Sequence, residues 1–240
     1  MSKYFNKYYW IRKILTYKFF SIFLSQKFLN KIIFNSIYKS NHWNKSRSFK
    51  PGVQSLSGPG SIPNSIQTNN LITELEKFFN KNDINSILDA PCGDCAWINK
   101  IFHTKVDYTG IDIVEDLINK NKIKFKSYKN VNFYCRDLTN FNGFNNYDLV
   151  LLRDFFIHLP LEVIKDVLVN LKNSNCNYFA FNNYEETNIN KEILTGQHRK
   201  INFKIAPFNL EEPVFKIQEI KNDNFSDKKN IDNFIYIYKN

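Results

Sequence analysis

Acidic residues stand at, or just after, the ends of four stretches of sequence that have the apolar character of buried β-strands. They are Asp89, Asp112, Asp137 and Asp154. In an open parallel sheet, ligands bind outside the carboxyl ends of the strands, so these four side chains are expected at one cleft. A carboxylate buried beside a cleft is costly unless a ligand or a cation offsets its charge. The pattern therefore predicts a ligand-binding site there.

The elements that would position these acids alternate between strands and helices. Apolar spacing predicts strands over 84–90, 108–113, 131–135, 147–152, 178–181, 214–220 and 231–238, and helices over 71–80, 95–102, 115–125 and 161–170. This alternation implies a parallel sheet with helices on both faces, and the last run suits an antiparallel strand near an edge. The predicted fold is α/β: a Rossmann-like, doubly wound, mostly parallel seven-stranded sheet with an antiparallel edge strand, plus an N-terminal helical extension.

The charge of the chain is unevenly distributed. Its 240 residues carry a formal net charge of +10, yet no Asp or Glu precedes Glu74. The excess positive charge therefore belongs to the N-terminal part, and the near-neutral remainder disfavours nucleic acid as a partner. Four cysteines are too few for a disulfide scaffold, and no secretory signal is visible, so a cytoplasmic protein is expected.

Composition divides the chain into three parts. Residues 1–50 are predicted to form a basic helical arm, 51–70 a linker or lid rich in Gly, Pro and Ser, and 71–240 the folded domain. On a helix, 11–33 would place apolar side chains on one face and most charges on the other. Three interpretations stay open: the stripe packs on the domain or a partner subunit, it makes a peripheral contact with a membrane, or it serves in targeting or nucleic-acid binding. The oligomeric state also stays open.

The segment that follows the first predicted strand reads DAPCGD over residues 89–94, and residues 86–238 resemble the class I S-adenosylmethionine (SAM)-dependent methyltransferases. In that family the first strand ends in an acid followed by a Gly-rich turn, and further acids follow the second and third strands. This sequence departs from the family pattern at Pro91 and Cys95, where glycines are more usual. The ordered acids at three separate strand ends carry the resemblance.

The resemblance implies a role for each of these residues. Asp89 would contact the methionine part of SAM, Asp112 the ribose hydroxyls and Asp137 the adenine amino group. Gly93 would let the backbone approach the cofactor. The full set of cofactor contacts that the resemblance implies is Asp89, Ala90, Pro91, Gly93, Asp112, Ile113, Asp137, Leu138 and Arg153.

Catalysis of methyl transfer depends mainly on positioning the acceptor against an activated methyl group, but a hydroxyl acceptor also needs a base. The candidate catalytic residues are Asp154 and His158, in the loop after the fourth strand. Asp154 could equally pair with Arg153, and His158 could equally cap or pack a helix. Further along, His198 and Arg199 are candidate contacts for an acidic or sugar acceptor, with an ordinary surface loop as the alternative.

The predicted function is a SAM-dependent methyltransferase acting on a small molecule, a glycan or a lipid precursor, with O-methylation ahead of N-methylation. The alternative is a catalytically silent methyltransferase-like module that acts as a partner subunit through its basic arm. A nicotinamide-dependent dehydrogenase is disfavoured, because the first turn contains only Gly93 and because Asp89 would face the pyrophosphate. Cys92 and Cys95 have the spacing of half a zinc site, but no matching pair follows, so no metal is predicted.

Overall fold

Seven strands form one sheet in the order β3-β2-β1-β4-β5-β7-β6. The computed structural model describes residues 25–44, 55–219 and 232–240. The strands are β1 (Ser86–Asp89), β2 (Asp107–Asp112), β3 (Val131–Cys135), β4 (Leu149–Leu152), β5 (Tyr178–Tyr184), β6 (Phe215–Gln218) and β7 (Asn233–Lys239). β1 to β5 pair in parallel, whereas β7 runs antiparallel to β5 and to the edge strand β6. The predicted mostly parallel, Rossmann-like sheet is confirmed.

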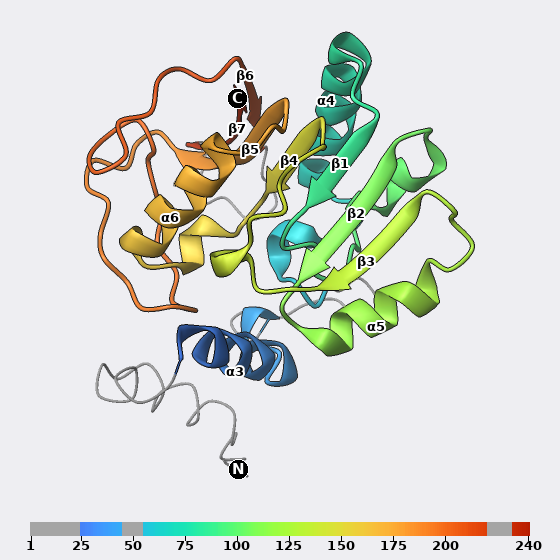
Figure 1. The fold of residues 1–240 in the computed structure, drawn as a ribbon, viewed down its shortest axis with the longest axis horizontal. Helices are drawn as coiled ribbons and strands as arrows, with labels where there is room; N and C mark the ends of the chain where they lie inside the picture. The colour runs from blue at the N-terminus through green and yellow to red at the C-terminus, as the bar shows by residue number, and fades with distance from the viewer. Residues whose placement is uncertain (1–24, 45–54, 220–231) are drawn as a thin grey trace.

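Helices cover both faces of this sheet (Figure 1). The α-helices are α3 (Gln26–Lys39), α4 (Ile66–Asn82), α5 (Glu115–Lys124) and α6 (Leu161–Lys172). Short 3-10 helices lie between them: η1 (His42–Asn44), η2 (Pro59–Ser61), η3 (Ile98–His103), η4 (Leu138–Asn140) and η5 (Phe156–His158). α4, η3 and α5 contribute to the core on one face, and α6 to the core on the other.

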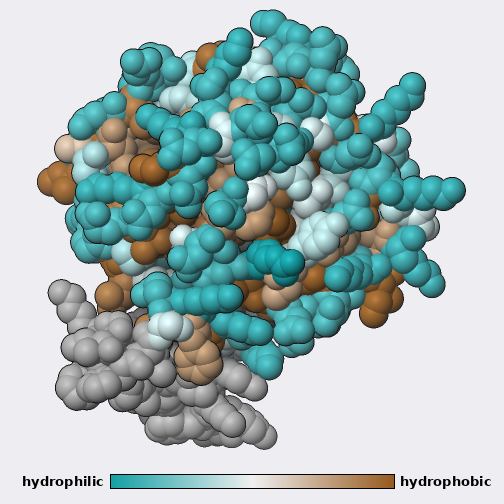
Figure 2. Space-filling view, viewed as in Figure 1, coloured by the Kyte–Doolittle hydropathy of each residue, from teal (hydrophilic) through white to brown (hydrophobic). Residues whose placement is uncertain are grey.

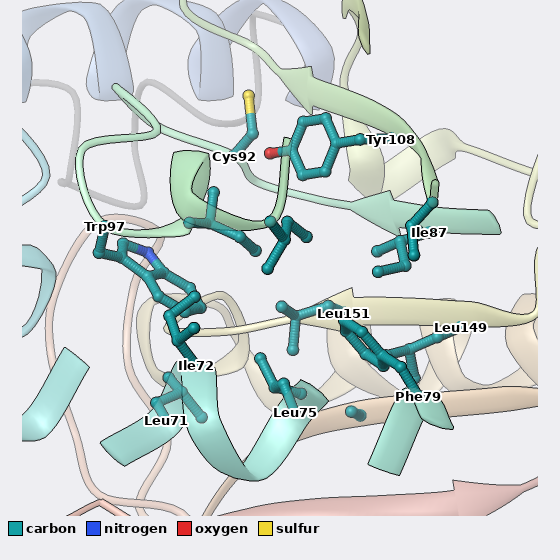
Figure 3. Packing of buried hydrophobic residues seen from close by; sticks show 14 of the residues in the cluster. Leu71, Ile72, Leu75, Phe79, Ile87, Cys92, Trp97, Tyr108, Leu149 and Leu151 are labelled. Carbon is teal, nitrogen blue, oxygen red and sulfur yellow. The ribbon is translucent and has the colours of Figure 1, made fainter. Parts of the chain in front are cut away.

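Strand β4 shows why the sheet is buried on both sides. All four of its residues are buried, with Leu149 and Leu151 in the core under α4 and the alternate residues in the core under α6. Side chains of α4 such as Leu75 pack toward this side of the sheet (Figure 3). Because consecutive strand residues point to opposite faces, an apolar run is what a doubly covered strand requires.

Two predicted helices differ from those observed. The helix expected over 95–102 is the 3-10 helix η3 instead, because Cys95 at φ 50° holds a left-handed turn and leaves too little chain for an α-helix. Helix α4 begins before the predicted 71, since the side chain of Ser65 accepts a hydrogen bond from the backbone of Thr68 and caps it. The end of the predicted linker therefore belongs to α4.

The described part of the arm packs on the domain. Leu29, Ile33 and Ile37 of α3 are buried, so over 26–33 the apolar stripe faces protein. The rest of the stripe, 11–24, lies outside the described residues. Within the part of the chain that the structure describes, none of the helices combines the length and apolar character needed to cross a bilayer. The face seen in Figure 2 carries mainly hydrophilic side chains, with apolar ones in smaller groups between them.

Candidate functional site

The carboxyl ends of β1 to β4 open onto one cavity. It encloses about 840 Å³ of space between atoms, part of it open to solvent. In Figure 1 the arrows of β1, β2 and β3 point toward helix α3, which lies across this end of the sheet. The sequence-predicted residues that line the cavity are Asp89, Pro91, Gly93, Asp112, Ile113, Asp137, Leu138, Arg153, Asp154 and His158. The fold thus brings the predicted strand-end acids together.

Asp89 ends strand β1 with a buried carboxyl group. Its Oδ2 accepts a hydrogen bond of 2.6 Å from the hydroxyl of Tyr108 on β2. Burial raises the pKa of Asp89 to about 7, although the Tyr108 hydrogen bond and the charge of Arg153 both lower it. The ionised form is therefore poorly compensated in the protein alone, and a cationic ligand in the cavity would stabilise it.

Asp112 ends the neighbouring strand β2 and ties two loops together. Its oxygens accept hydrogen bonds from the backbone amides of Val114, at 2.9 Å, and Gly93, at 3.1 Å. Burial still raises the pKa of Asp112 to about 6, because these amides offset only part of the desolvation. Its carboxyl group thus lies between the turn after β1 and the start of α5, on the cavity wall.

The turn at Gly93 accommodates the linker. Gly93 has φ 56°, and a Cβ placed there would lie 2.1 Å from Oγ of Ser57. Asp94 fastens the same segment, since its carboxylate accepts hydrogen bonds from the hydroxyls of Ser55 and Ser57 and from the amide of Leu56. The glycine is therefore required by the close approach of residues 55–57, a reason that the family resemblance did not supply.

Asp137 follows β3 and caps the 3-10 helix η4. Its Oδ1 accepts hydrogen bonds from the amide of Thr139, at 3.0 Å, and from the hydroxyl of Thr139, at 2.8 Å. Its Oδ2 accepts a hydrogen bond of 3.3 Å from the side chain of Asn30 in α3. The N-terminal helix thus contacts the acid that the resemblance assigns to the adenine end of the site.

Arg153, at the end of β4, belongs to a buried ion network. Its guanidinium lies 2.7 Å from Glu219 and 3.2 Å from Asp154, and it stacks over the ring of Trp97 with its Cζ at 5.0 Å from the centroid. Burial lowers the pKa of Arg153, but the charges of Asp154 and Glu219 outweigh this and hold it above its ordinary value. Asp154 therefore pairs with Arg153 and also lines the cavity, so the structure is compatible with both predicted roles, ion-pair partner and catalytic residue.

His158 lies where η5 meets the cavity. Its Nδ1 is 2.9 Å from the backbone oxygen of Gln197, and its ring lies against that of Trp43 in a tilted contact, with centroids 4.4 Å apart and an interplanar angle of 38°. Burial lowers the pKa of His158 to about 4, so the ring is neutral at physiological pH. Because a carbonyl oxygen only accepts hydrogen bonds, Nδ1 carries the proton and Nε2 is left as a base.

His198 and Arg199 are not among the residues that line this cavity. Arg199 is only 6% exposed and donates from Nη1 to the backbone oxygen of Leu159 at 2.6 Å, while its Nε and Nη2 have no hydrogen-bond partner. His198 is exposed, with its ring 5.7 Å from that of His158. Arg199 therefore contacts the backbone that follows η5, and His198 lies next to His158 of η5. Neither side chain reaches the cavity wall.

Several lining residues escaped the sequence prediction. Phe34 and Tyr38 come from α3, Trp43 from η1, and Ser57 and Ser61 from the linker. The spacing of Phe34 and Tyr38, one helical turn apart, puts them on one face of a helix. That signal was available in the sequence, but it does not say which surface the face meets.

The sheet order and the helices on both faces of the sheet are those of the Rossmann-like fold that solved methyltransferases share. Residues 88–175 match the sequence model of a methyltransferase domain. Among curated proteins, none matches the chain in sequence.

Solved structures with this fold match most of the chain at low sequence identity. The N-methyltransferase NodS of Bradyrhizobium japonicum WM9, in complex with S-adenosyl-L-homocysteine (SAH), has a TM-score of 0.57 and 14% identity, over 85% of this chain and 97% of that one. A 1,6-didemethyltoxoflavin-N1-methyltransferase of Burkholderia thailandensis has a TM-score of 0.56 and 13% identity, over 73% and 79%. The methyltransferase domain of the bacterial protein CtHen1 has a TM-score of 0.56 and 11% identity, over 72% and 100%.

Proposed function

We propose that this chain is a SAM-dependent methyltransferase that acts on a hydroxyl group of a small molecule, a glycan or a lipid precursor. The observation that carries the proposal is the meeting of Asp89, Asp112 and Asp137, from the ends of three different strands, in one cavity. The match of residues 88–175 to a methyltransferase domain and the fold shared with solved methyltransferases support SAM-dependent methyl transfer, and the choice of a hydroxyl acceptor rests on Asp154 and His158 at the cavity.

The chemistry of the cavity wall fits this cofactor. Asp89 and Asp112 are buried carboxyl groups with raised pKa values, so they favour a ligand that brings hydroxyl donors and positive charge. Arg153 is already paired with Glu219, and no lysine lines the cavity in the described part of the chain. A dinucleotide pyrophosphate would meet Asp89 without a free cation, whereas a ribose and a sulfonium suit these acids.

The proposal is tested by calorimetric titration of the full chain with SAH, with NADH as the control ligand. We expect micromolar binding of SAH and none of NADH. If SAH does not bind, the result favours the alternative function, a catalytically silent methyltransferase-like module that acts through its basic arm. If NADH binds instead, the site belongs to a different cofactor.

In this proposal SAM supplies a methyl group on a sulfonium, and the chain's own residues position and deprotonate the acceptor. His158 faces the cavity as a neutral imidazole whose Nδ1–H is held by Gln197, which leaves Nε2 to take a proton from an acceptor hydroxyl. The nearby charge of Asp154 raises the pKa of His158 against the effect of burial, so it would stabilise the imidazolium as it forms. A base after β4 is what methyl transfer to a hydroxyl group requires, since the thioether product leaves without taking up a proton.

Replacing His158 with glutamine should lower kcat for a hydroxyl acceptor by about 100-fold to 10,000-fold, because a general base is removed. The affinity for SAH should change by less than about threefold, since the cofactor acids stay in place. Steady-state kinetics on the acceptor found by screening, together with calorimetry, would measure both. His103→Gln, an exposed histidine that does not line the cavity, is the matched control. An unchanged kcat in H158Q would show that His158 is not the base.

The packing of α3 on the domain limits which part of the basic arm could contact a membrane. Because Leu29 and Ile33 are buried on the domain, the proposed peripheral membrane contact is left to the part of the 11–33 stripe that precedes Leu29. That segment is basic and apolar in sequence, which suits an anionic membrane surface. Cosedimentation of the full chain with phosphatidylglycerol vesicles, compared with phosphatidylcholine vesicles, tests this part of the proposal.

A further inference from the structure

Helix α3 closes the side of the cavity that faces the strand ends. It lies across the end of the sheet in Figure 1, and two of its side chains, Phe34 and Tyr38, line the cavity together with Trp43 of η1. None of these residues belongs to the strand-end motifs on which the proposed function rests. The N-terminal segment therefore contributes part of the wall of the site, and its contacts indicate how it is held there.

At one end of the cavity α3 is joined to the domain by a buried amide. Asn30 is 1% exposed, and its Nδ2 donates to Oγ1 of Thr139 at 3.0 Å and to Oδ2 of Asp137 at 3.3 Å. Leaving such buried groups without partners would cost stability, so Asn30 favours the closed position of the helix. The pair formed nearby by Lys31 and Glu115, at 3.4 Å, is exposed on both sides and adds little.

In the middle of the cavity the contact is made by Tyr38. Its hydroxyl lies 3.3 Å from Oγ of Ser57, which in turn bonds to Asp94 at 3.1 Å. The same hydroxyl is 3.4 Å from the position that a Cβ of Gly93 would occupy. Burial raises the pKa of Tyr38 well above its ordinary value, and the charge of Asp112 adds to this. A neutral phenol thus sits beside Asp112 and the Gly93 turn, where it can donate one hydrogen bond and accept others.

Apolar contacts also hold α3 against the rest of the protein. Ile33 approaches the backbone of Gly196 so closely that a Cβ there would lie 2.5 Å from Cγ2 of Ile33. Beyond the end of α3, the ring of Trp43 lies against that of His158 in a tilted contact. The contacts that hold α3 are thus a few buried apolar side chains, the buried amide of Asn30, the Tyr38–Ser57 hydrogen bond, the exposed Lys31–Glu115 pair and one tilted ring pair. The core clusters that include α4 and α6 contain many more buried side chains than the cluster formed by α3, so we expect opening of α3 to cost less free energy than unfolding of the sheet.

We infer that α3 is a lid of the cofactor site, that Tyr38 contacts the bound cofactor beside Asp112, and that the cofactor is exchanged only when α3 moves away. The inference rests on the proposed function, because the cofactor is the one proposed above. It adds a binding residue, Tyr38, and a retaining residue, Asn30, from a segment outside the strand-end motifs. It also makes the closed helix the form that retains the cofactor and places His158 against Trp43.

The test is the rate at which SAH leaves the full chain, followed by the fluorescence of Trp43 and Trp97, which both line the cavity. N30A should release SAH about tenfold faster or more, which corresponds to about 1.4 kcal/mol. N35A is the matched control, since Asn35 bonds only to the backbone of Lys31 within the same helix, and it should stay within about twofold.

A second variant tests the contact itself. Y38F should weaken SAH binding by about threefold to tenfold, because one hydrogen bond to the ligand is lost. Y128F, at a tyrosine whose hydroxyl bonds to His103 outside the cavity, should leave the affinity unchanged. Thermal unfolding of each variant shows whether an effect follows from lost folding. Equal affinities of Y38F and the wild type would overturn the contact.

Hydrogen exchange on the wild-type chain gives an independent measurement that needs no variant. Amides of α3 should exchange at least about tenfold more slowly with SAH bound, whereas those of α6 should change little. If SAH binds but α3 protection and the N30A release rate are both unchanged, the lid is wrong and the proposed function stands. If SAH does not bind at all, the proposed function fails and this inference fails with it.

Discussion

Replacing Asp112 with alanine is expected to weaken SAH binding by about 30-fold to 1000-fold, because charge-assisted hydrogen bonds to the ribose hydroxyls are lost. The buried carboxylate lies on the cavity wall at the end of β2, held by the amides of Val114 and Gly93. Calorimetric titration with SAH measures the loss. No other residue of the site is expected to matter more for affinity.

The control for this variant is Asp116→Ala, which makes the same change at an exposed position in the first turn of the neighbouring helix α5. It should bind SAH as the wild type does. Because Asp112 also holds the Gly93 turn, D112N is included to separate the ribose contact from a local rearrangement. Asparagine keeps one acceptor for the amides but cannot accept from both hydroxyls as a carboxylate does. If D112A binds SAH normally, the ribose does not lie at the end of β2.

Replacing Asp89 with asparagine is expected to remove most of the pH dependence of SAM binding. In the wild type, burial raises the pKa of Asp89 to about 7 and that of Asp112 to about 6. SAM should bind the ionised carboxylates, so affinity should rise with pH, by about 10-fold to 100-fold between pH 5 and pH 8. In D89N the affinity for SAM should rise less with pH than in the wild type, and the rise should be centred near the pKa of Asp112.

Titrations of SAM at several pH values, with Asp107→Asn as the control, measure this dependence. Asp107 is exposed at the start of β2, far from the strand end, so D107N should follow the wild-type curve. A wild-type affinity that stays constant from pH 5 to pH 8 would contradict the prediction, and so would a D89N curve that keeps the full wild-type slope.

Asp89 and Asp112 also contribute to the way in which the stability of the cofactor-free protein depends on pH. Their pKa values in the folded state, about 7 for Asp89 and about 6 for Asp112, lie above the unfolded value of 3.8. Between these values the folded protein binds more protons than the unfolded chain, so the free energy of unfolding falls as pH rises. The contribution is fully present below about pH 4 and is lost as pH passes 7. Urea unfolding of wild type and D89N at pH 5 and pH 8 would measure the difference.

The sequence alone was sufficient to predict the parallel sheet and the acidic residues at the carboxyl ends of its strands. Apolar runs such as 149–152 must be buried on both faces, which requires a doubly covered parallel sheet, and parallel strands end at the same edge. The positions of Asp89, Asp112 and Asp137 at one cavity follow from local pattern and this topology. Local pattern was less informative where left-handed residues intervene, and for that reason the helix expected over 95–102 became the short η3.

Only the tertiary structure decided what covers the site and how its charges behave. The sequence shows that α3 has an apolar face, but whether that face meets the domain, a partner or a membrane depends on contacts between residues far apart in the chain, such as Asn30 with Asp137. The tertiary structure also pairs Arg153 with Glu219 and keeps Arg199 out of the cavity lining. Burial and long-range pairing set the pKa values of Asp89 and His158, because desolvation is a property of the packed molecule and not of residue type.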